Sequence, residues 1–466
     1  MFSLYPDYRR TDLSWLEYLP ESWVILRTKQ MFRLVIEKAP INNQMELLSV
    51  YTNIGVRPRK SLEQRGNKAS TTDGYWIVKK GDMVSNKLLA WMGAIGVSHY
   101  EGVTSPAYDV LRSIKSCNTD YYHFLFRTKK YLQQFKTRSR GIMDMRLRLY
   151  FDQFGQIPIP VPPRSEQDQI VAYLRAQDAH IARFIKAKRE LIGLLTEQKL
   201  RIIDHAVTRG LDASVALKPS GVEWLGDVPE HWNTSRLKYC VSRIHAGGTP
   251  DTGVDSYWSD SSDGIPWLLI ADVTRADRVV TSTKRLTQTG LASKRLTIVP
   301  AGAVLYTMYA SIGKAAILEI DAAINQAILG LEPKSNLLVP EFLFFWLRSL
   351  ERHIKNLAST STQANLNAAK VKALPIFLPS VDEQKIICDW IKSECRIFDD
   401  AITRTEEEIK LIREYRDRQI ADVVTGQVDV RGWQPGPDDV VREEDLLALG
   451  GDEDVEPDGD DDDGDE

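Results

Sequence analysis

Cysteine is scarce in this sequence, and the four cysteines, Cys117, Cys240, Cys388 and Cys395, lie far apart. The last two are seven residues apart on an expected helix, so they share a face of that helix but do not form a metal-ligand pattern. The seven histidines are scattered without a cluster. We therefore expect a reduced, cytoplasmic protein with no disulfide framework and no metal site.

Long apolar runs and the motifs of several enzyme classes are also missing. No stretch of about 18 apolar residues is free of charge and no signal-peptide pattern opens the chain, so we expect neither a membrane span nor export. The Asn/Asp-Pro-Pro-Tyr/Phe motif of adenine methyltransferases and the Gly-x-x-x-x-Gly-Lys-Ser/Thr loop of ATPases are absent. The acidic pair Asp382-Glu383 suits the positive start of an expected helix better than it suits catalysis. We predict no catalytic residue.

The net charge of −4 conceals an uneven distribution. Residues 438–466 hold 16 acidic residues and one basic residue, so residues 1–437 carry a net charge of +11. Residues 1–150, with 24 basic and 13 acidic residues, contain the same excess of +11. A basic surface of this kind attracts a phosphate backbone, although a modest excess can also serve solubility alone. We expect residues 430–466 to form an acidic disordered tail that either aids solubility or competes with nucleic acid.

The sequence contains an internal repeat of one unit. Four landmarks recur in the same order: residues 15–23 match 224–232, 78–84 match 299–305, 157–167 match 374–384, and 207–212 match 424–429. The corresponding shifts are 209, 221, 217 and 217 residues, and they change only between landmarks, where insertions fit in loops. The chain therefore consists of two similar units.

Each unit combines a front part of short strands and turns with a long helix. Apolar residues follow a seven-residue spacing, broken at Lys188 and Thr405, at Leu174, Ile181, Leu195 and Ile202 and again at Ile391, Phe398 and Ile412. A helix of about 35–40 residues is about 55 Å long, too long to be buried against one small domain. We predict an α+β fold: two globular α/β domains, each followed by a long helix. The helices should pair as an antiparallel coiled coil with pseudo-two-fold symmetry.

The repeated motifs resemble those of the specificity subunit of type I restriction–modification systems. They are the Trp-Leu-Gly-x-x-Pro-x-x-Trp opening, the Pro-x-x-x-Glu-Gln helix start and the Val-Thr-x-Gly-Leu-Asp helix end, and the similarity runs from about Asp12 to Asp429. Further matching pieces are Gly247-Gly248-Thr249-Pro250, Ile265-Pro266-Trp267, Ala310-Ser311-Ile312-Gly313, Asn325-Gln326 and, in the first unit, Ser105-Pro106-Ala107-Tyr108. The first unit lacks the Gly-Gly-Thr-Pro piece and has a divergent opening.

The resemblance implies a division into recognition domains and spacers. Target recognition domains would occupy residues 1–160 and 213–379, and helical spacers residues 161–212 and 380–429. Each recognition domain would read one half of a bipartite, asymmetric site in double-stranded DNA, and the helices would set the number of unread base pairs. The helices would also dock two modification subunits, which methylate adenine, and through them restriction subunits. The chain itself would be non-catalytic, with S-adenosylmethionine, Mg²⁺ and ATP bound only by partner subunits.

Candidate DNA contacts differ between the two units. In the first unit we expect basic side chains on phosphates, at Arg57, Arg59, Lys60, Arg127, Lys129, Lys130, Lys136, Arg138, Arg140, Arg146 and Arg148. Tyr121, Tyr122 and Tyr131 precede or interleave with this stretch. In the nearly neutral second unit we expect polar loop residues, at Gly248, Thr249, Ser311, Lys314, Gln326, Gln363 and Asn365. The alternative interpretation is a solvated basic face and ordinary turns.

Two other functions remain open from the sequence. The chain could recognise DNA for another defence or regulatory complex that lacks a methyltransferase partner. Alternatively, it could be a helical scaffold whose repeated units bind only proteins. We favour DNA recognition within a modification and restriction assembly, because both the duplication and the motif order agree with it.

Overall fold

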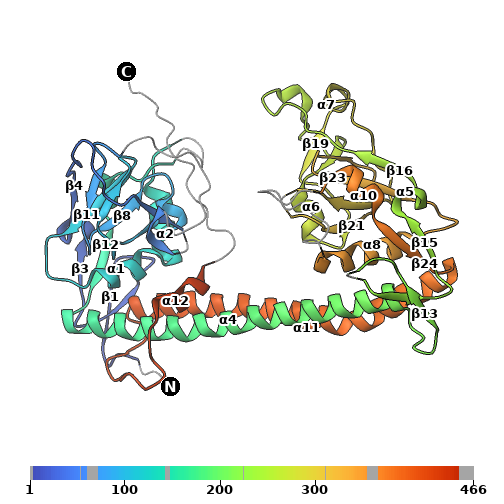
Figure 1. Cartoon of the computed structure of the whole chain (residues 1–466). Helices are drawn as coiled ribbons and strands as arrows, with labels where there is room; N and C mark the ends of the chain where they lie inside the picture. The colour runs from blue at the N-terminus through green and yellow to red at the C-terminus, as the bar shows by residue number, and fades with distance from the viewer. Residues whose placement is uncertain are drawn as a thin grey trace. The chain divides into compact units, whose positions relative to one another are not determined.

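The chain folds into two compact units, and the boundary between them falls within each of the two long helices. The structure is a computed structural model that describes residues 4–52, 54–59, 72–141, 147–223, 225–309, 311–353 and 366–450. Unit 1 comprises Met1–Glu190 and Thr405–Glu466, and unit 2 comprises Leu191–Arg404. Helices α4 (Arg164–Arg209) and α11 (Val381–Val424) each begin in one unit and end in the other. Each unit therefore holds one globular domain, the start of one long helix and the end of the other (Figure 1).

The domain of unit 1 is built on a four-stranded antiparallel sheet. Its strand order is β4 (Phe32–Val35), β11 (Tyr108–Ser113), β8 (Met83–Asn86) and β9 (Ile95–Val97). Two further antiparallel pairs are β5 (Leu48–Tyr51) with β6 (Gly55–Pro58), and β7 (Trp76–Val78) with β10 (Gly102–Thr104). Helices α1 (Thr119–Phe126), α2 (Lys129–Arg138) and α3 (Phe151–Phe154) contribute aromatic side chains to the core.

The domain of unit 2 has the same plan with a larger sheet. Its strand order is β16 (Val241–Ala246), β23 (Ile328–Pro333), β20 (Val304–Thr307), β21 (Ala315–Leu318) and β18 (Arg278–Val279). A second sheet has the order β19 (Lys284–Leu286), β17 (Ile265–Leu268) and β22 (Ala323–Ile324). The domain's helices are α5 (Leu237–Cys240), α6 (Ile270–Arg275), α7 (Gln288–Ser293), α8 (Pro340–Ser349) and α10 (Ala368–Ala373).

The repeated sequence landmarks form repeated structure. Hairpin β1 (Tyr8–Arg10) with β2 (Tyr18–Pro20) corresponds to β13 (Leu217–Pro219) with β14 (Asp227–Pro229). Each opening then continues into a strand that pairs with a proline run: β3 (Val24–Arg27) with β12 (Pro158–Val161), and β15 (Asn233–Arg236) with β24 (Pro375–Leu378). Prolines are tolerated in β12 and β24 because each strand has only one paired neighbour. The repeat therefore marks the place where each domain meets its helix.

A carboxylate connects each opening to the first turn of a long helix, and it is buried in unit 1 and half-buried in unit 2. In unit 1, Glu166 accepts hydrogen bonds from Trp23 Nε1 at 3.0 Å and from the Tyr5 hydroxyl at 2.5 Å. In unit 2, Glu383 accepts a bond of 3.0 Å from Trp232 Nε1. Trp23 is 1% exposed and Trp232 is fully buried, whereas Trp224 lies outside the described residues. Each indole thus buries a large apolar surface and still satisfies its N–H group.

The glutamine next to each of these glutamates fastens a second helix. Gln167 accepts a hydrogen bond of 2.9 Å from the backbone N–H of Asn118, which caps α1, and donates one of 2.8 Å to the carbonyl of Pro162. Gln384 does the same with the N-cap residue of α8, Val339, at 2.8 Å and with Pro379 at 3.0 Å. The Glu-Gln pair therefore has a positioning function in the fold.

The end of the other long helix reaches the same tryptophan. Gly426 follows α11 with φ of 72°, and a Cβ atom there would come within 3.3 Å of the Trp23 ring and within 2.5 Å of Pro20. Gly210 follows α4 with φ of 73° and faces Trp232 at 3.4 Å in the same way. The left-handed conformation favours glycine at both helix ends, and at Gly426 the close approach of Pro20 excludes a side chain as well. Gly210 directly follows α4, whereas α11 ends at Val424, two residues before Gly426.

The two long helices run antiparallel within each unit. In unit 1, Arg416 binds Asp178 at 2.6 and 2.9 Å and Lys188 binds Glu408 at 2.5 Å, while in unit 2 Lys199 binds Asp399 at 2.6 Å. The residue numbers of these contacts rise along α4 while those of their partners on α11 fall, as expected for antiparallel helices. Of the predicted pairing residues, Leu174, Ile181 and Ile391 are buried and the rest are half-buried, namely Leu195, Ile202, Phe398 and Ile412. The predicted α+β class, with a long helix after each domain, is confirmed, whereas the pseudo-two-fold symmetry and the domain boundaries stay predictions.

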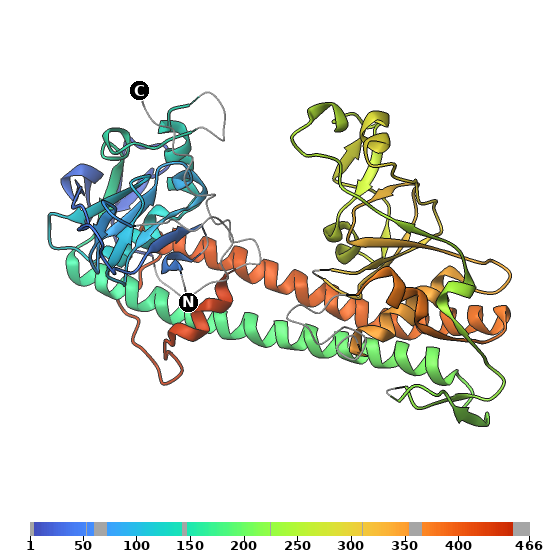
Figure 2. The same cartoon turned by 45° about the horizontal axis from the view of Figure 1, so that its top comes forward.

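The prediction of disorder after residue 430 is wrong for residues 430–450, which we call the C-terminal segment. This segment folds back onto α4 and includes the short helix α12 (Glu443–Leu446). Figure 2 shows α12 lying across α4. Val430 is 1% exposed, and the Trp433 ring packs edge-on against Tyr173 with 5.5 Å between ring centres. The error arose because the acidic composition of the tail as a whole masked these apolar residues. Residues 451–466 lie outside the described residues.

We predict that Glu166→Ala destabilises unit 1. The substitution leaves the buried Tyr5 hydroxyl and the Trp23 N–H group without an acceptor, which costs about 2–4 kcal/mol in the free energy of unfolding. Urea denaturation followed by tryptophan fluorescence measures this change. Glu190→Ala, at an exposed position of the same helix, is the control and should change the free energy by less than about 0.5 kcal/mol. Equal effects of the two variants would contradict the role given to Glu166.

Candidate nucleic-acid interface

Most of the basic stretch predicted in unit 1 lies on or next to α2. Lys129 and Lys130 are exposed at the start of this helix. Lys136 Nζ lies 4.7 Å from the centre of the Trp91 ring, and the Arg138 guanidinium carbon lies 5.6 Å from that of the Trp15 ring. Such cation–π contacts orient a cation without neutralising it. These four residues can therefore present positive charge to a phosphate backbone.

The segments that follow α2 add two further arginines. Arg140 and Arg148 exchange backbone hydrogen bonds of 3.0 and 2.9 Å, and both are exposed. Arg140 also pairs with the exposed carboxylate of Asp152 at 2.8 Å. An exposed ion pair of this kind is weak, so a phosphate can replace the carboxylate. Arg146, the third predicted arginine here, lies outside the described residues.

Arg127 has an internal role that the sequence did not reveal. Its guanidinium donates hydrogen bonds to the backbone carbonyls of Gly93 at 2.9 Å and Ile95 at 3.0 Å, and to the carbonyl of Thr52. The side chain therefore fastens the end of α1 to the turns that follow β5 and precede β9. Because its donors are engaged in these bonds, Arg127 is better explained as a structural residue than as a phosphate contact.

The second predicted basic cluster lies on β6 and the residues after it. Arg57 donates a hydrogen bond of 2.7 Å to the Tyr100 hydroxyl, and its guanidinium carbon lies 5.9 Å from the centre of that ring. The backbone N–H group of Arg59 binds the carbonyl of Leu47 at 2.8 Å. Lys60 lies outside the described residues. The two described arginines are half-buried, so their side chains are less accessible to a phosphate than the exposed Lys129 and Lys130.

The tyrosines near the basic stretch belong to the core. Tyr121, Tyr122 and Tyr131 are each 0% exposed, and burial raises the pKa of all three hydroxyl groups. Tyr121 donates a hydrogen bond of 2.8 Å to the carbonyl of Val424, and Tyr131 one of 3.0 Å to that of Pro158. They connect the domain to α11 and β12 and are not available for stacking on bases.

In unit 2 the structure brings three of the predicted polar pieces together. Trp267 Nε1 donates a hydrogen bond of 3.1 Å to the carbonyl of Gly248, and the Thr249 hydroxyl donates one to the side-chain oxygen of Gln326. The backbone N–H of Asn325 binds the carbonyl of Leu268 at 3.1 Å. Gly248, Thr249 and Gln326 therefore form one surface, on which Gln326 is exposed. Paired hydroxyl and amide groups of this type can exchange their mutual bond for bonds to base edges.

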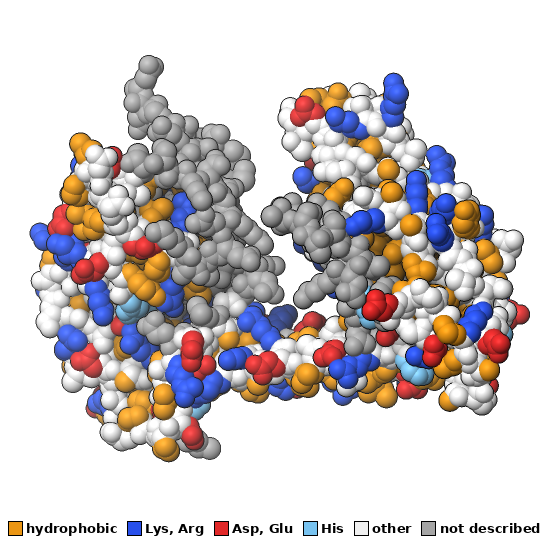
Figure 3. Space-filling view, viewed as in Figure 1, with side chains coloured by type: hydrophobic (Ala, Val, Ile, Leu, Met, Phe, Trp, Pro, Cys, Tyr) orange, Lys and Arg blue, Asp and Glu red, His pale blue; other side chains and the backbone are white. Residues whose placement is uncertain are grey.

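The structure adds Lys294 and Arg295 to this surface, which sequence reasoning missed. Both side chains are exposed in the turn after α7, and a Cβ atom at Gly248 would meet Leu296 at 2.9 Å and Lys294 at 3.8 Å. Arg295 has φ of 51°, an uncommon conformation for a residue other than glycine. Lys and Arg side chains are prominent on the part of unit 2 away from the long helices (Figure 3). The near-neutral charge count of this unit hid their uneven placement.

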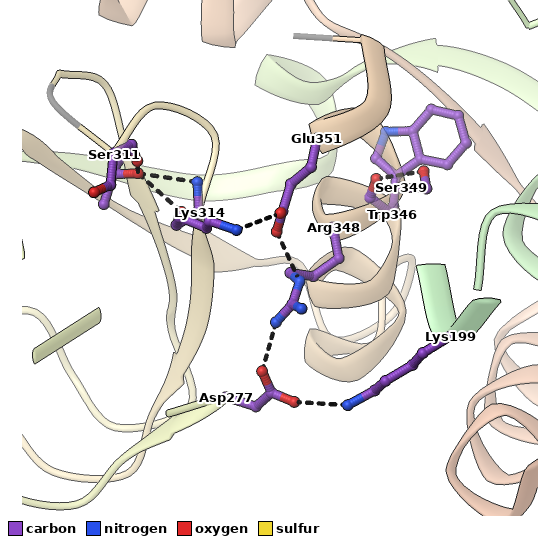
Figure 4. A network of polar contacts seen from close by, with 9 residues as sticks. Lys199, Asp277, Ser311, Lys314, Trp346, Arg348, Ser349 and Glu351 are labelled. Atoms are coloured by element: carbon purple, nitrogen blue, oxygen red, sulfur yellow. Dashed lines mark hydrogen bonds and ion pairs between the residues drawn. The ribbon is translucent and has the colours of Figure 1, made fainter. Parts of the chain in front are cut away.

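Lys314 is held in a chain of ion pairs rather than standing ready for phosphate. Its Nζ atom binds Glu351 at 2.6 Å, and Glu351 binds Arg348 at 2.8 Å. Arg348 continues to Asp277 at 2.5 Å, and Asp277 lies 3.7 Å from Lys199 of α4 (Figure 4). The neighbouring Ser311 carbonyl accepts a hydrogen bond from Thr307. This chain of contacts ties the loop of Ser311 and Lys314 to the helix, while Gln363 and Asn365 lie outside the described residues.

A charged hollow of about 680 Å³ lies within unit 1, between α1, α4, α11 and the C-terminal segment. Asp120 pairs there with Arg175 at 2.7 Å and with His99 at 3.3 Å. Burial opposes ionisation of Asp120, but the hydrogen bond with His99 and the charge of Arg175 hold its pKa below the usual range. Burial, followed by the charge of Arg127, lowers the pKa of His123 to about 3. The acidic and basic groups of the hollow pair with one another, which indicates a structural network.

Two negative findings concern the described part of the chain. Over these residues, no helix combines the length and the apolar character that crossing a membrane requires. The same residues contain no group of three or more His, Cys, Asp or Glu side chains arranged to hold a metal ion.

Comparison with known proteins finds the same domain twice in this chain. The family model described as the type I restriction modification DNA specificity domain matches residues 20–192 and 229–411. The two matches fall on the two halves of the internal repeat. Each begins in an opening at Pro20 or Pro229 and includes the Glu-Gln pair at the start of the following long helix.

Two curated relatives from Methanocaldococcus jannaschii are similar to this chain. The MjaIX specificity subunit of a type I restriction enzyme is 26% identical over 192 residues, which are 40% of this chain and 42% of the relative. The MjaVIII specificity subunit is 23% identical over 434 residues, 89% of this chain and 94% of the relative. The first match thus spans less than half the length of that relative. A chain from a solved structure on complex assembly and conformational transition of the type I R-M system has 16% identity and a TM-score of 0.49, covering 87% of this chain and 98% of that chain.

We predict different effects from the basic residues of unit 1. Replacing both Lys129 and Lys130 by Ala should lower the slope of log K against log salt for DNA binding by about 1–2, because each phosphate contact contributes about 0.9. Arg127→Ala should instead lower the free energy of unfolding by about 2–4 kcal/mol, because it removes the guanidinium hydrogen bonds to three backbone carbonyls, of which, among the described residues, only that of Gly93 keeps another donor, the N–H group of Ile95. Salt titrations of duplex binding and urea denaturation separate the two effects. An unchanged slope in the lysine variant would exclude these residues from the interface.

We also predict that His123 makes unit 1 sensitive to acid. Its folded-state pKa of about 3 lies below the ordinary value of 6.5, so only the unfolded chain takes up a proton as the pH falls from 6.5. The free energy of unfolding that the neutral His123 side chain contributes is therefore fully present above pH 6.5. It is lost as the pH falls toward 3, by up to about 1.4 kcal/mol per pH unit. The measurement compares urea midpoints at pH 7 and pH 4.5 for the wild type, His123→Gln and the exposed control His205→Gln. Only His123→Gln should reduce the pH dependence.

Proposed function

Because two copies of the type I restriction modification DNA specificity domain cover most of its length, this chain belongs to that family, and we propose that it is the DNA-recognition subunit of a type I restriction–modification system. The observation that carries the proposal is the duplicated domain, each copy fixed to a long helix by the same Trp–Glu contact. Two domains of one plan but different surfaces suit a DNA site with two different halves.

The two domains would read their half-sites by different chemistry. Unit 1 offers exposed cations on and after α2, which suit phosphate contacts. Unit 2 offers the Thr249–Gln326 pair beside Lys294 and Arg295, in which an amide can read a base edge while the cations bind the adjacent backbone. Helices α4 and α11 would then set the number of base pairs that remain unread between the half-sites.

An apolar stripe on α11 supports docking of modification subunits. Ile386, Trp390 and Ile397 follow one face of α11 in unit 2, with exposed fractions of 62, 36 and 72%. Leu411 on α11 in unit 1 and Leu194 on α4 in unit 2 occupy equivalent positions of the repeat and are 63 and 62% exposed. Large apolar side chains on a helix surface mark a place where another protein packs. One docking site on the long helices of each unit would give two modification subunits and, through them, the attachment of restriction subunits.

Catalysis and cofactors would belong to these partners. We assign methylation of adenine and the binding of S-adenosylmethionine to the modification subunits, and Mg²⁺- and ATP-dependent steps to the partner subunits. This chain would be a non-catalytic cytoplasmic protein that acts on double-stranded DNA away from any membrane. Its contribution to the reaction would be the choice of site.

The decisive experiment is co-expression with the cognate modification subunit, followed by mapping of N6-methyladenine. We expect methylation of one split, asymmetric motif. Ile397→Asp should reduce this methylation at least about tenfold and leave DNA binding by the isolated chain unchanged. Arg396→Asp, one residue away and off the apolar stripe, is the matched control and should keep methylation within about twofold. Binding of a split site without methylation would instead favour a complex that lacks a methyltransferase.

A further inference from the structure

The C-terminal segment covers one face of α4, and the equivalent face of α11 is exposed. Glu166 and Thr208 on α4 correspond to Glu383 on α11 and to Thr425 directly after it, with the same shift of 217 residues, so the two segments align without a gap. By this alignment Gln169, Tyr173 and His180 are the counterparts of Ile386, Trp390 and Ile397. The latter three are the exposed apolar stripe of unit 2.

All three counterparts on α4 contact the C-terminal segment. The Gln169 side chain donates a hydrogen bond of 2.5 Å to the carbonyl of Trp433. The Trp433 ring packs against Tyr173, which is 0% exposed, whereas the equivalent Trp390 is 36% exposed. His180 Nε2 pairs with Asp439 at 2.7 Å. The same helix face is therefore covered in one unit and open in the other.

The contacts farther along the segment are polar and lie near the surface. Arg183 donates hydrogen bonds of 2.9 Å to the carbonyls of Asp438 and Val440, and Arg189 donates one of 2.9 Å to that of Gly450. A hollow of about 470 Å³ remains between His180, Arg183 and the segment. The two Arg183 bonds are exposed and exchange readily with water, so the middle of the segment is held less firmly than a core element, whereas the Arg189 bond is partly buried.

We propose that the C-terminal segment is a built-in cap that makes the two docking sites unequal, and this inference rests on the docking proposed above. A modification subunit would bind the open apolar stripe of unit 2 directly. At unit 1 it would have to displace the cap before it reached the equivalent face of α4. The assembly would then pass through a species with one modification subunit bound at unit 2.

The chemistry of the open stripe indicates what the partner presents to it. Asp382, Asp389 and Asp400 lie along one side of Ile386, Trp390 and Ile397 on the helix surface, and all three are exposed. A complementary surface is an apolar helix flanked by Lys or Arg side chains. In unit 1 the counterparts of Ile386 and Ile397 are Gln169 and His180, which bind a carbonyl and a carboxylate group of the cap instead.

The test is a titration of the full chain with purified cognate modification subunit, read by calorimetry and sedimentation. We expect two binding steps in the wild type, the second at least about tenfold weaker than the first. Replacing His180 and Arg189 by Ala loosens the cap and should strengthen the second step at least about tenfold while leaving the first unchanged. Ile397→Asp should weaken only the first step. A chain truncated after Gly450 keeps the cap and is the matched control, with both steps unchanged.

Hydrogen exchange in the wild type gives a second measurement, which does not depend on whether a variant folds. Amide exchange across residues 430–450 should accelerate at least about tenfold during the second binding step and stay unchanged during the first. Two equal steps, or unaltered exchange in the segment at saturation, would overturn the cap while leaving the docking proposal intact. No binding at either unit would overturn both proposals.

Discussion

The fold depends on two contacts between a carboxylate and a buried indole. Glu166 binds the N–H group of Trp23, and Glu383 binds that of Trp232, each at 3.0 Å. At each contact the opening of a domain, the first turn of one long helix and the glycine that ends the other helix meet. Since a buried indole N–H group without an acceptor is costly, each contact stabilises the three elements together. This junction is what turns a small domain and an elongated helix into one unit.

The junction also explains which parts of the fold could be predicted. The helices were visible because their apolar spacing is local, and the repeat was visible because both junctions need the same Trp, Glu-Gln and glycine signals. The sequence could not show which residues contact one another, since Trp23 and Glu166 are separated by 143 positions and no local pattern connects them. The order of residues 430–450 was missed for a related reason. Trp433 becomes structural only because Tyr173 lies opposite it.

The candidate DNA surface was less predictable, because a run of charges in sequence is not a patch in space. The stretch beginning at Arg127 contains a guanidinium bound to three carbonyls, the exposed lysines of α2 and arginines beside aromatic rings. Lys314 likewise looked free in sequence and is neutralised by Glu351. Conversely, Lys294 and Arg295 matter only because their turn packs on Gly248, some 46 positions earlier in the chain. Charge counts establish that cations are present, whereas folding decides which of them face outward.

The two halves of the chain are free to differ wherever the junctions do not constrain them. The spacing from Glu166 to Thr208 equals that from Glu383 to Thr425, and the two helices, of 46 and 44 residues, are nearly equal in length. On their outer faces the same positions carry Gln169 and His180 in one helix and Ile386 and Ile397 in the other. A polar face accepts the chain's own C-terminal segment, and an apolar face must be covered by something else. The duplication therefore preserves how each domain is attached, while divergence of the surfaces gives each unit its own DNA chemistry and its own neighbours.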